Sequence, residues 1–136
     1  MEKKVELRLP ATDETLKDVQ NTMETLLRKN GCPETHIMPI LIAAEEIFIN
    51  IAHYAYEGKA GEAVVVIEVT PNNFKATFRD RGMPYNPLAK EDPDITLSAQ
   101  ERKIGGLGVF MVKESMDKVN YEYKDGWNIF TMEKKF

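Results

Sequence analysis

Cysteine is almost missing from this 136-residue chain, which carries only Cys32. A single thiol can form neither an internal disulfide nor a zinc site built from several thiolates. Basic side chains are in the minority as well, because 18 Lys and Arg stand against 22 Asp and Glu and give a formal net charge of −4. That charge repels a phosphate backbone over most of the surface, so the composition argues against direct nucleic-acid binding.

Membrane and export signals are also missing from the sequence pattern. No continuous apolar run approaches the ~18 residues of a membrane span, and residues 1–5 lack the apolar stretch of a signal peptide. We therefore expect a soluble, cytoplasmic protein without a membrane partner. Hydrophobic residues make up 43% and charged residues 29% of the chain, a balance typical of one globular domain of this length.

Apolar periodicity predicts an α+β fold. A first helix is expected from about residue 12 to the stop at Asn30 and Gly31, and a more apolar second helix from about Pro39 to Tyr56, with Pro39 in its first turn. Further elements are expected as strands at 5–9, 62–70, 74–79, 118–123 and 127–133 and a helix at about 107–116. Strands that gather late and join as hairpins favour a two-layer sandwich of a mixed, mainly antiparallel sheet with helices on one face.

The stretch at about 83–104 combines several prolines and charges and has no clear periodicity. A stretch of this length without secondary structure, inside a compact domain, is usually functional or mobile. We interpret it as a mobile lid of a single domain that covers residues 1–136.

Three polar residues of the apolar second helix share one face, whereas Glu45 points elsewhere. At ~100° per residue, Glu46, Asn50 and His53 fall within a narrow arc of one helical face. Burying an unpaired carboxylate or amide is costly, so these groups are expected to face a polar cavity or a ligand. The alternative is an ordinary helical hydrogen bond between Glu46 and Asn50, with His53 a satisfied core residue. The helix alone does not decide between the two interpretations.

A first glycine motif, Asp-Arg-Gly-Met-Pro at 80–84, directly follows a predicted strand. Asp80 at the end of the sheet can accept a hydrogen bond from a ligand amine, and Gly82 permits close approach of the backbone. Taken alone, the motif is equally compatible with a plain turn.

A second glycine motif, Gly-Gly-Leu-Gly at 105–108, immediately precedes a predicted helix. Its amide groups and the helix N-terminus could hold an anionic group, and Lys103 adds positive charge. The motif is neither a P-loop nor a dinucleotide fingerprint, because the Gly-Lys-Ser/Thr ending and the parallel-strand unit are both missing. A structural turn is the alternative here too.

In this order, Glu-x-x-x-Asn, Asp-x-Gly-x-Pro and Gly-Gly-Leu-Gly together resemble the GHKL ATPase superfamily of gyrase and histidine-kinase ATP domains. Segments 46–50, 55–56, 80–82 and 105–109 look like the stand-alone anti-sigma-factor serine/threonine kinases, and the resemblance covers nearly the whole chain. It implies the Bergerat ATP-binding fold, the cofactors ATP and Mg²⁺, and a kinase that phosphorylates an antagonist protein and sequesters a sigma factor or similar regulator of transcription. A catalytically silent, nucleotide-gated partner switch is the alternative function.

The resemblance also implies a role for each motif residue. Glu46 would be the catalytic base toward a serine hydroxyl, and Asn50 would be the protein ligand of the magnesium that bridges the phosphates. Asp80 would accept from the adenine amino group. His53 would contact the phosphates, and Asn128 stands where many relatives place a threonine that binds an adenine-linked water. The residues expected to contact ATP are Asn50, His53, Asp80, Gly82, Met83, Lys103, Gly105, Gly106, Leu107, Gly108, Val109 and Asn128.

A homodimer is a further implication of the resemblance. It would form through the first strand and helix, where Val5, Leu7 and Leu9 offer an edge.

Overall fold

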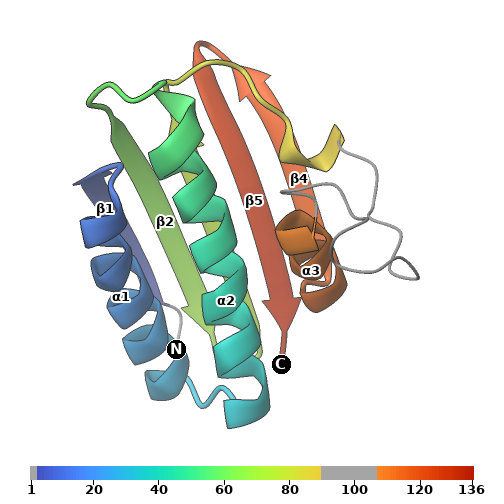
Figure 1. The fold of residues 1–136 in the computed structure, drawn as a ribbon. Coiled ribbons are helices and arrows are strands. Elements are labelled where there is room, and N and C mark those ends of the chain that lie inside the picture. Colours follow the sequence, from blue (N-terminus) through green and yellow to red (C-terminus); the bar gives the residue numbers. More distant parts are fainter. Residues whose placement is uncertain (1–2, 90–106) are drawn as a thin grey trace.

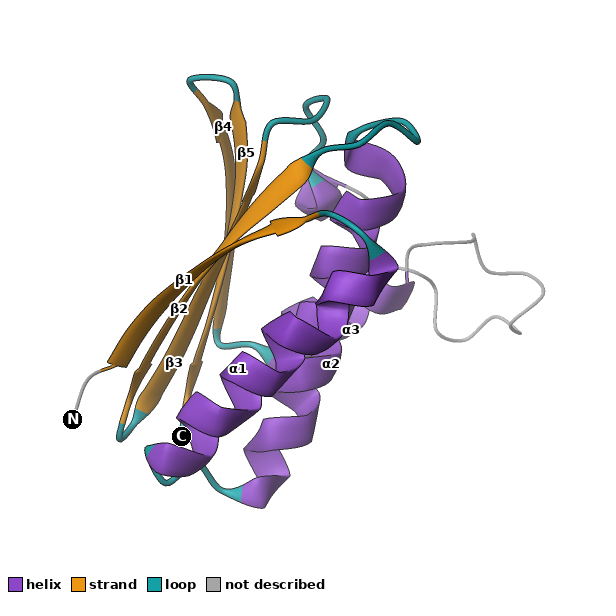
Figure 2. Ribbon diagram, turned by 90° about the vertical axis from the view of Figure 1, so that its left-hand side faces the viewer, coloured by secondary structure: helices purple, strands orange, loops and turns teal. Residues whose placement is uncertain are grey.

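The computed structural model describes residues 3–89 and 107–136 of the chain. Its strands and helices form two layers, with α1, α2 and α3 together on one face of a twisted sheet (Figures 1 and 2). In chain order the elements are β1 (Lys3–Pro10), a 3₁₀ turn (Asp13–Thr15), α1 (Leu16–Lys29), α2 (Glu34–Asn50), a π-helical turn (Ile51–Ala55), β2 (Glu62–Thr70), β3 (Asn73–Asp80), a second 3₁₀ turn (Pro87–Ala89), α3 (Leu107–Ser115), β4 (Lys118–Lys124) and β5 (Trp127–Lys135).

The sheet has the strand order β1-β2-β3-β5-β4. All four strand pairs are antiparallel in the part of the chain that the structure describes. The α+β sandwich with helices on one face is therefore confirmed, and the sheet contains no parallel pair among these strands. The register places Asp80 at the end of β3 directly opposite Asn128 of β5, so two distant segments of the chain meet there.

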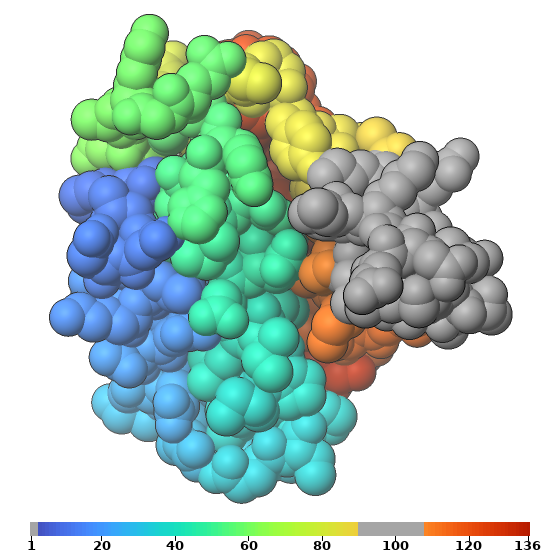
Figure 3. Space-filling view, in the orientation of Figure 1, coloured from blue at the N-terminus to red at the C-terminus, as the bar shows by residue number. Residues whose placement is uncertain are grey.

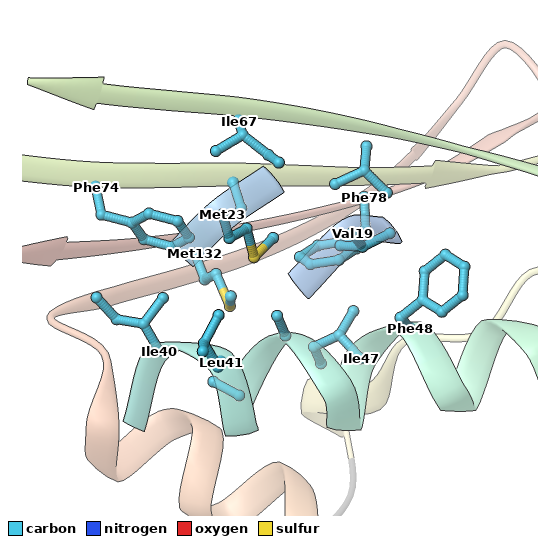
Figure 4. Close-up of a cluster of buried hydrophobic side chains, with 14 of the residues drawn as sticks. Val19, Met23, Ile40, Leu41, Ile47, Phe48, Ile67, Phe74, Phe78 and Met132 are labelled. Atoms are coloured by element: carbon cyan, nitrogen blue, oxygen red, sulfur yellow. The ribbon is translucent and has the colours of Figure 1, made fainter. Parts of the chain in front are cut away.

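The core fills the space between the helices and the sheet. Alternate side chains along each strand point toward the helices, and they pack there against the apolar stripe of α1. Figure 4 shows this layer, in which each fully buried aliphatic or aromatic side chain contributes roughly 1.5–3 kcal/mol. The fully buried side chains include Val19, Met23, Ile40, Phe48, Ile67, Phe74, Phe78 and Met132.

The second helix begins earlier than its sequence pattern predicts. It starts at Glu34, so Pro39 lies inside the helix and not in its first turn. Proline lacks the N–H that would bond to the carbonyl of Thr35. Both residues are exposed, and water can hydrate that carbonyl, which explains why the helix tolerates the proline here.

The continuous helical segment Glu34–Ala55 has 22 residues, and an 18-residue window within it has a mean hydropathy of 1.4, enough by length and composition to cross a membrane. The expectation concerned uninterrupted apolar runs, and the run in this helix ends at Glu45 and Glu46, well short of the ~18 residues of a span. Ile40, Ala44 and Phe48 are buried in the domain core, which accounts for the apolar character of a core helix.

The sequence also predicts a two-residue turn at Asp125-Gly126 between the last two strands, and backbone angles confirm this turn and the helix stop at Gly31. Asp125 and Gly126 both have positive φ, at 54° and 84°, as a two-residue turn between β4 and β5 requires. Gly31 has a φ of 78° directly after α1, the left-handed conformation that ends many helices. Of the predicted lid at 83–104, residues 90–104 lie outside the described residues, and Pro87–Ala89 forms a 3₁₀ turn.

Candidate functional site

A cavity of about 430 Å³ opens between α2, the segment after β3, and strands β4 and β5. Figure 3 shows the segment after β3, in yellow, beside the C-terminal end of α2, in green. Mostly apolar and aromatic walls with a few convergent polar groups are typical of small-molecule sites. The lining residues are Ile47, Asn50, Ile51, Tyr54, Ala55, Phe78, Asp80, Met83, Tyr85, Pro87, Tyr121, Asn128 and Phe130.

Asp80 is the buried acidic group of this cavity, with only 4% of its surface exposed. The backbone N–H of Gly82 donates to its Oδ1 at 2.9 Å, and Asn128 Nδ2 donates to the same oxygen at 3.0 Å. Burial raises the pKa of the Asp80 carboxyl group, while these two hydrogen bonds act in the opposite direction. Among the described residues both donors reach Oδ1, so Oδ2 is the oxygen available to a ligand.

Gly82 brings the segment after β3 into close contact with the π-helical turn. A Cβ at this position would overlap the backbone carbonyl of Ala55. The next residue, Met83, donates its N–H to that same carbonyl at 2.9 Å. In this structure the close approach at Gly82 is to the protein backbone, and its contact with a nucleotide stays a prediction.

Asn128 is buried beside Asp80 and connects four segments. Its Nδ2 donates to the Asp80 carboxylate and to the carbonyl of Met83 at 3.0 Å, with the carbonyl of Gly82 at 3.4 Å. Its Oδ1 accepts from the N–H of Tyr85 at 3.1 Å and from the hydroxyl of Tyr121. The antiparallel register of β3 and β5 creates this arrangement.

Glu46 and Asn50 lie one helical turn apart, and Asn50 Nδ2 donates to Glu46 Oε1 at 3.4 Å. The helical hydrogen bond named as the alternative interpretation is therefore present. Asn50 also lines the main cavity, whereas Glu46 lines a small groove of about 60 Å³ between α2 and α3. A Cβ at Gly108 would overlap the Glu46 carboxyl group, so the two helices touch at this point.

His53 does not share the face of Glu46 and Asn50, which corrects the predicted common arc. It lies in the π-helical turn, where the backbone bonds from i to i+5 and each residue turns through a smaller angle than in an α-helix. Its ring lies near α1 instead, with Nε2 at 2.8 Å from Asp13 Oδ1. Tyr54, the next residue, lines the cavity.

The other residues predicted to contact a nucleotide are distributed as follows. Met83 is 48% exposed and lines the cavity. Leu107 begins α3, and Val109 is buried in the same helix. Lys103, Gly105 and Gly106 lie outside the described residues.

Three tyrosines of the cavity were not predicted from the sequence. Tyr54, Tyr85 and Tyr121 come from the π-helical turn, the segment after β3, and β4. The alternation of side chains along the strands could have identified Tyr121. This residue is directly opposite the core residue Phe130, so both side chains point to the same face of the sheet. The other two depend on a helical register and a chain path that no periodicity encodes.

Comparison with known proteins identifies the class to which this fold and site belong. The model of the histidine kinase-like ATPase domain family matches residues 9–134, and the chain belongs to that family. Within it, the chain is similar to proteins named serine-protein kinase RsbW from Bacillus cereus (strain AH820) and Bacillus thuringiensis (strain Al Hakam). Each is 25% identical over 130 residues, which covers 93% of this chain and 81% of the relative.

A solved structure has the same fold. The crystal structure of the RsbU and RsbW domains of a Mycobacterium tuberculosis protein matches with a TM-score of 0.67 and 18% identity, covering 97% of this chain and 32% of the solved chain. The chain thus spans about a third of the length of that solved chain. The resemblance to the GHKL anti-sigma kinase family, first drawn from the motifs, is confirmed.

Proposed function

We propose that this protein binds ATP in the cavity and transfers its γ-phosphoryl group to a serine or threonine of an antagonist protein, and that it sequesters a sigma factor or similar regulator. The name serine-protein kinase of its relatives supports this activity. The observation that carries the proposal is the meeting of Asn50, Asp80 and Asn128, from three separated segments, on one cavity. Their elements are far apart in the sequence and converge only in the fold.

Asp80 selects the nucleobase of the bound nucleotide. Its available Oδ2 is an acceptor at the buried end of β3, and it suits the exocyclic amino group of adenine. Guanine presents a carbonyl oxygen at the corresponding position, and two acceptors facing each other in a buried site repel. The geometry therefore favours ATP over GTP.

Asn50 supplies the contact for the metal ion of an ATP–magnesium substrate. Amide oxygens are suitable Mg²⁺ ligands, and Mg²⁺ usually keeps phosphate and water oxygens as its other ligands. Among the described residues the hydrogen bond of Asn50 to Glu46 uses Nδ2, so Oδ1 is available for the metal. No group of three or more His, Cys, Asp or Glu side chains in the described residues could hold a metal by itself, which fits a metal held chiefly by the phosphates. When bound, Mg²⁺ would neutralise charge on those phosphates.

Glu46 acts as the general base of the phosphoryl transfer. Its carboxylate accepts the proton of the substrate hydroxyl as the hydroxyl oxygen bonds to the γ-phosphorus, and the bond to the bridging oxygen breaks to leave ADP. The groove beside Glu46 between α2 and α3 gives the hydroxyl-bearing segment a route to this carboxylate.

The experiment measures transfer from γ-labelled ATP to a candidate antagonist protein. Glu46→Gln should abolish transfer and keep ATP affinity within about threefold, because glutamine still accepts the Asn50 hydrogen bond but is no base. Glu45→Gln is the matched control, since Glu45 is exposed on the same helix. Absence of saturable ATP–magnesium binding in calorimetry overturns the proposal.

A nucleotide-gated binding module is the second candidate, and one contact favours it. The hydrogen bond from Asn50 gives Glu46 a structural use that needs no catalysis. This candidate predicts tight ATP or ADP binding, partner release that depends on the nucleotide, and no phosphoryl transfer in the wild-type protein.

The proposal includes a cytoplasmic homodimer. β1 is an edge strand of the sheet, so its outer backbone groups are available to a second copy. Val5, Leu7 and Leu9 are half-buried against the core, so the backbone edge is what β1 mainly offers. Sedimentation equilibrium of the wild-type protein tests the dimer, and the mass of a single copy over the whole concentration range would contradict it.

A further inference from the structure

The side chain of Asn128 is only 6% exposed, and its hydrogen-bonding groups are occupied by the protein. Nδ2 donates toward Asp80 Oδ1 and toward the carbonyls of Met83 and Gly82. Oδ1 accepts from the Tyr85 N–H and the Tyr121 hydroxyl. An amide offers two donor hydrogens and two acceptor sites, so this network leaves it no unused group for a ligand.

The network also fixes which way the amide points. A flipped amide would place Oδ1 against a carboxylate and two carbonyl oxygens, and Nδ2 against the N–H of Tyr85. Unmatched polar groups in a buried site are costly, so only the observed orientation is stable. The Tyr121 hydroxyl contributes to this choice because it donates to Oδ1.

The orientation of Asn128 determines how Asp80 meets the cavity. With Nδ2 and the Gly82 N–H both at Oδ1, that oxygen is held toward β5 and the segment after β3. The carboxyl plane is then fixed, and Oδ2 is the oxygen directed to a bound base. Without the Asn128 amide, one backbone donor remains and the carboxyl group can rotate.

We propose that Asn128, oriented by Tyr121, is a positioning residue for nucleobase selection, and that it acts through Asp80 without touching the nucleotide. This inference rests on the proposed ATP site. It differs from the sequence expectation, which placed Asn128 in contact with ATP or with a water on the base. The same amide also holds Met83 and Tyr85, two residues of the cavity wall, in place.

The test compares ATP and GTP binding by calorimetry in the wild-type protein, Asn128→Ala and Tyr121→Phe. Asn128→Ala should weaken ATP binding about tenfold or more and leave weak GTP binding almost unchanged, so the preference for ATP falls by about the same factor. Tyr121→Phe, which removes one hydroxyl, should give a smaller loss of a few-fold in the same direction. Asn120→Ala is the matched control, because Asn120 is exposed on β4 and should change neither affinity.

The pH dependence of ATP binding separates positioning from general loosening of the fold. The Asn128 hydrogen bond is one of the groups that hold the Asp80 carboxyl group ionised. In Asn128→Ala the pH midpoint below which ATP binding is lost should therefore move upward. Burial, and to a smaller extent the charge on Asp80, raise the pKa of the nearby Tyr56 and Tyr121 hydroxyls, so both are neutral in the acidic range where this midpoint lies.

Each outcome bears on one of the two claims. No ATP binding by the wild-type protein overturns the proposed function itself. ATP binding by the wild type, with unchanged selectivity and an unchanged pH midpoint in folded Asn128→Ala, overturns the positioning role. If Asn128→Ala does not fold, Tyr121→Phe decides, and an unchanged ATP preference in that variant counts against the inference.

Discussion

The carboxyl group of Glu46 on α2 lies against the backbone of Gly108 on α3, so closely that a Cβ at residue 108 would overlap it. Gly108→Ala must therefore displace α3 or turn the Glu46 side chain. We expect phosphoryl transfer to fall at least about tenfold, because a base displaced by about an ångström loses much of its effect. Labelled-ATP transfer at saturating ATP measures this change.

A double-mutant cycle checks the origin of that loss. The atoms that a Cβ would meet are the far end of a flexible side chain that can turn aside, so the cost in the free energy of unfolding should stay below the ~1–3 kcal/mol typical of core overpacking. In a Glu46→Ala background the overlap is gone, so Gly108→Ala should cost much less stability there. Equal costs in both backgrounds would show that Glu46 and Gly108 are not coupled.

The hydroxyl of Tyr56 joins the start of β2 to the segment after β3. It donates to the carbonyl of Glu62 and accepts from the N–H of Arg81 at 2.9 Å. Tyr56→Phe leaves both backbone groups without this partner, so the free energy of unfolding should fall by about 1 kcal/mol. Urea denaturation followed by the fluorescence of Trp127, the only tryptophan, measures the change.

The matched control for Tyr56 is Tyr123→Phe. Tyr123 is 47% exposed at the end of β4, and surface changes of this kind usually stay within about 0.5 kcal/mol. A loss in Tyr56→Phe no larger than in this control would contradict the bridging role.

Ile67 at the centre of β2 tests the core. It is fully buried between the helices and the sheet, beside Phe74 and Phe78 in Figure 4. Ile67→Ala should lower the free energy of unfolding by about 2–5 kcal/mol, through lost burial and the cavity left behind. Ile42→Ala removes the same side chain from a 45% exposed position on α2 and should cost less than about 1 kcal/mol. Similar losses in the two variants would contradict the core assignment.

Local patterns in the sequence predicted most of the fold. Alternation located the strands, and the Asp125-Gly126 turn identified the last hairpin, because both depend on residues near each other in the chain. The order of three short motifs indicated the family, and the family model that matches residues 9–134 confirms it. Asn50 and Asp80 do line one cavity.

The errors arose where structure departs from regular periodicity or depends on distant partners. His53 was placed by a constant helical angle, which the π-helical turn breaks. The start of α2 was placed at Pro39, because proline is common in the first turn, but an exposed proline is tolerated further in. The amide network of Asn128 depends on the register between β3 and β5, which no local pattern specifies.

Two aspartates should contribute to the free energy of unfolding with opposite pH dependence. Ionised Asp117 stabilises the folded protein. The N–H of Lys135 donates to Asp117 Oδ2 at 2.6 Å and, with the nearby Lys134 ammonium, lowers the pKa of this carboxyl group. A depressed pKa in the folded state means stability that is present above the unfolded value of about 3.9 and is lost as pH falls through the folded value. Asp117→Asn should therefore lower the free energy of unfolding at pH 7 and remove that part of the acid dependence.

Asp80 should behave in the reverse sense. Burial raises the pKa of its carboxyl group, so the folded protein binds this proton more tightly than the unfolded chain, and stability falls as pH rises from about 3.9 through the folded value. Asp80→Asn keeps an acceptor for Gly82 and Asn128 but removes the buried charge, so it should raise the free energy of unfolding at pH 7 while ATP affinity falls by roughly tenfold or more. Urea titrations between pH 3 and pH 8, paired with ATP calorimetry at pH 7, measure both effects. If Asp80→Asn lowered the free energy of unfolding at pH 7, the hydrogen bonds of the ionised Asp80 carboxylate would stabilise the fold by more than its burial costs.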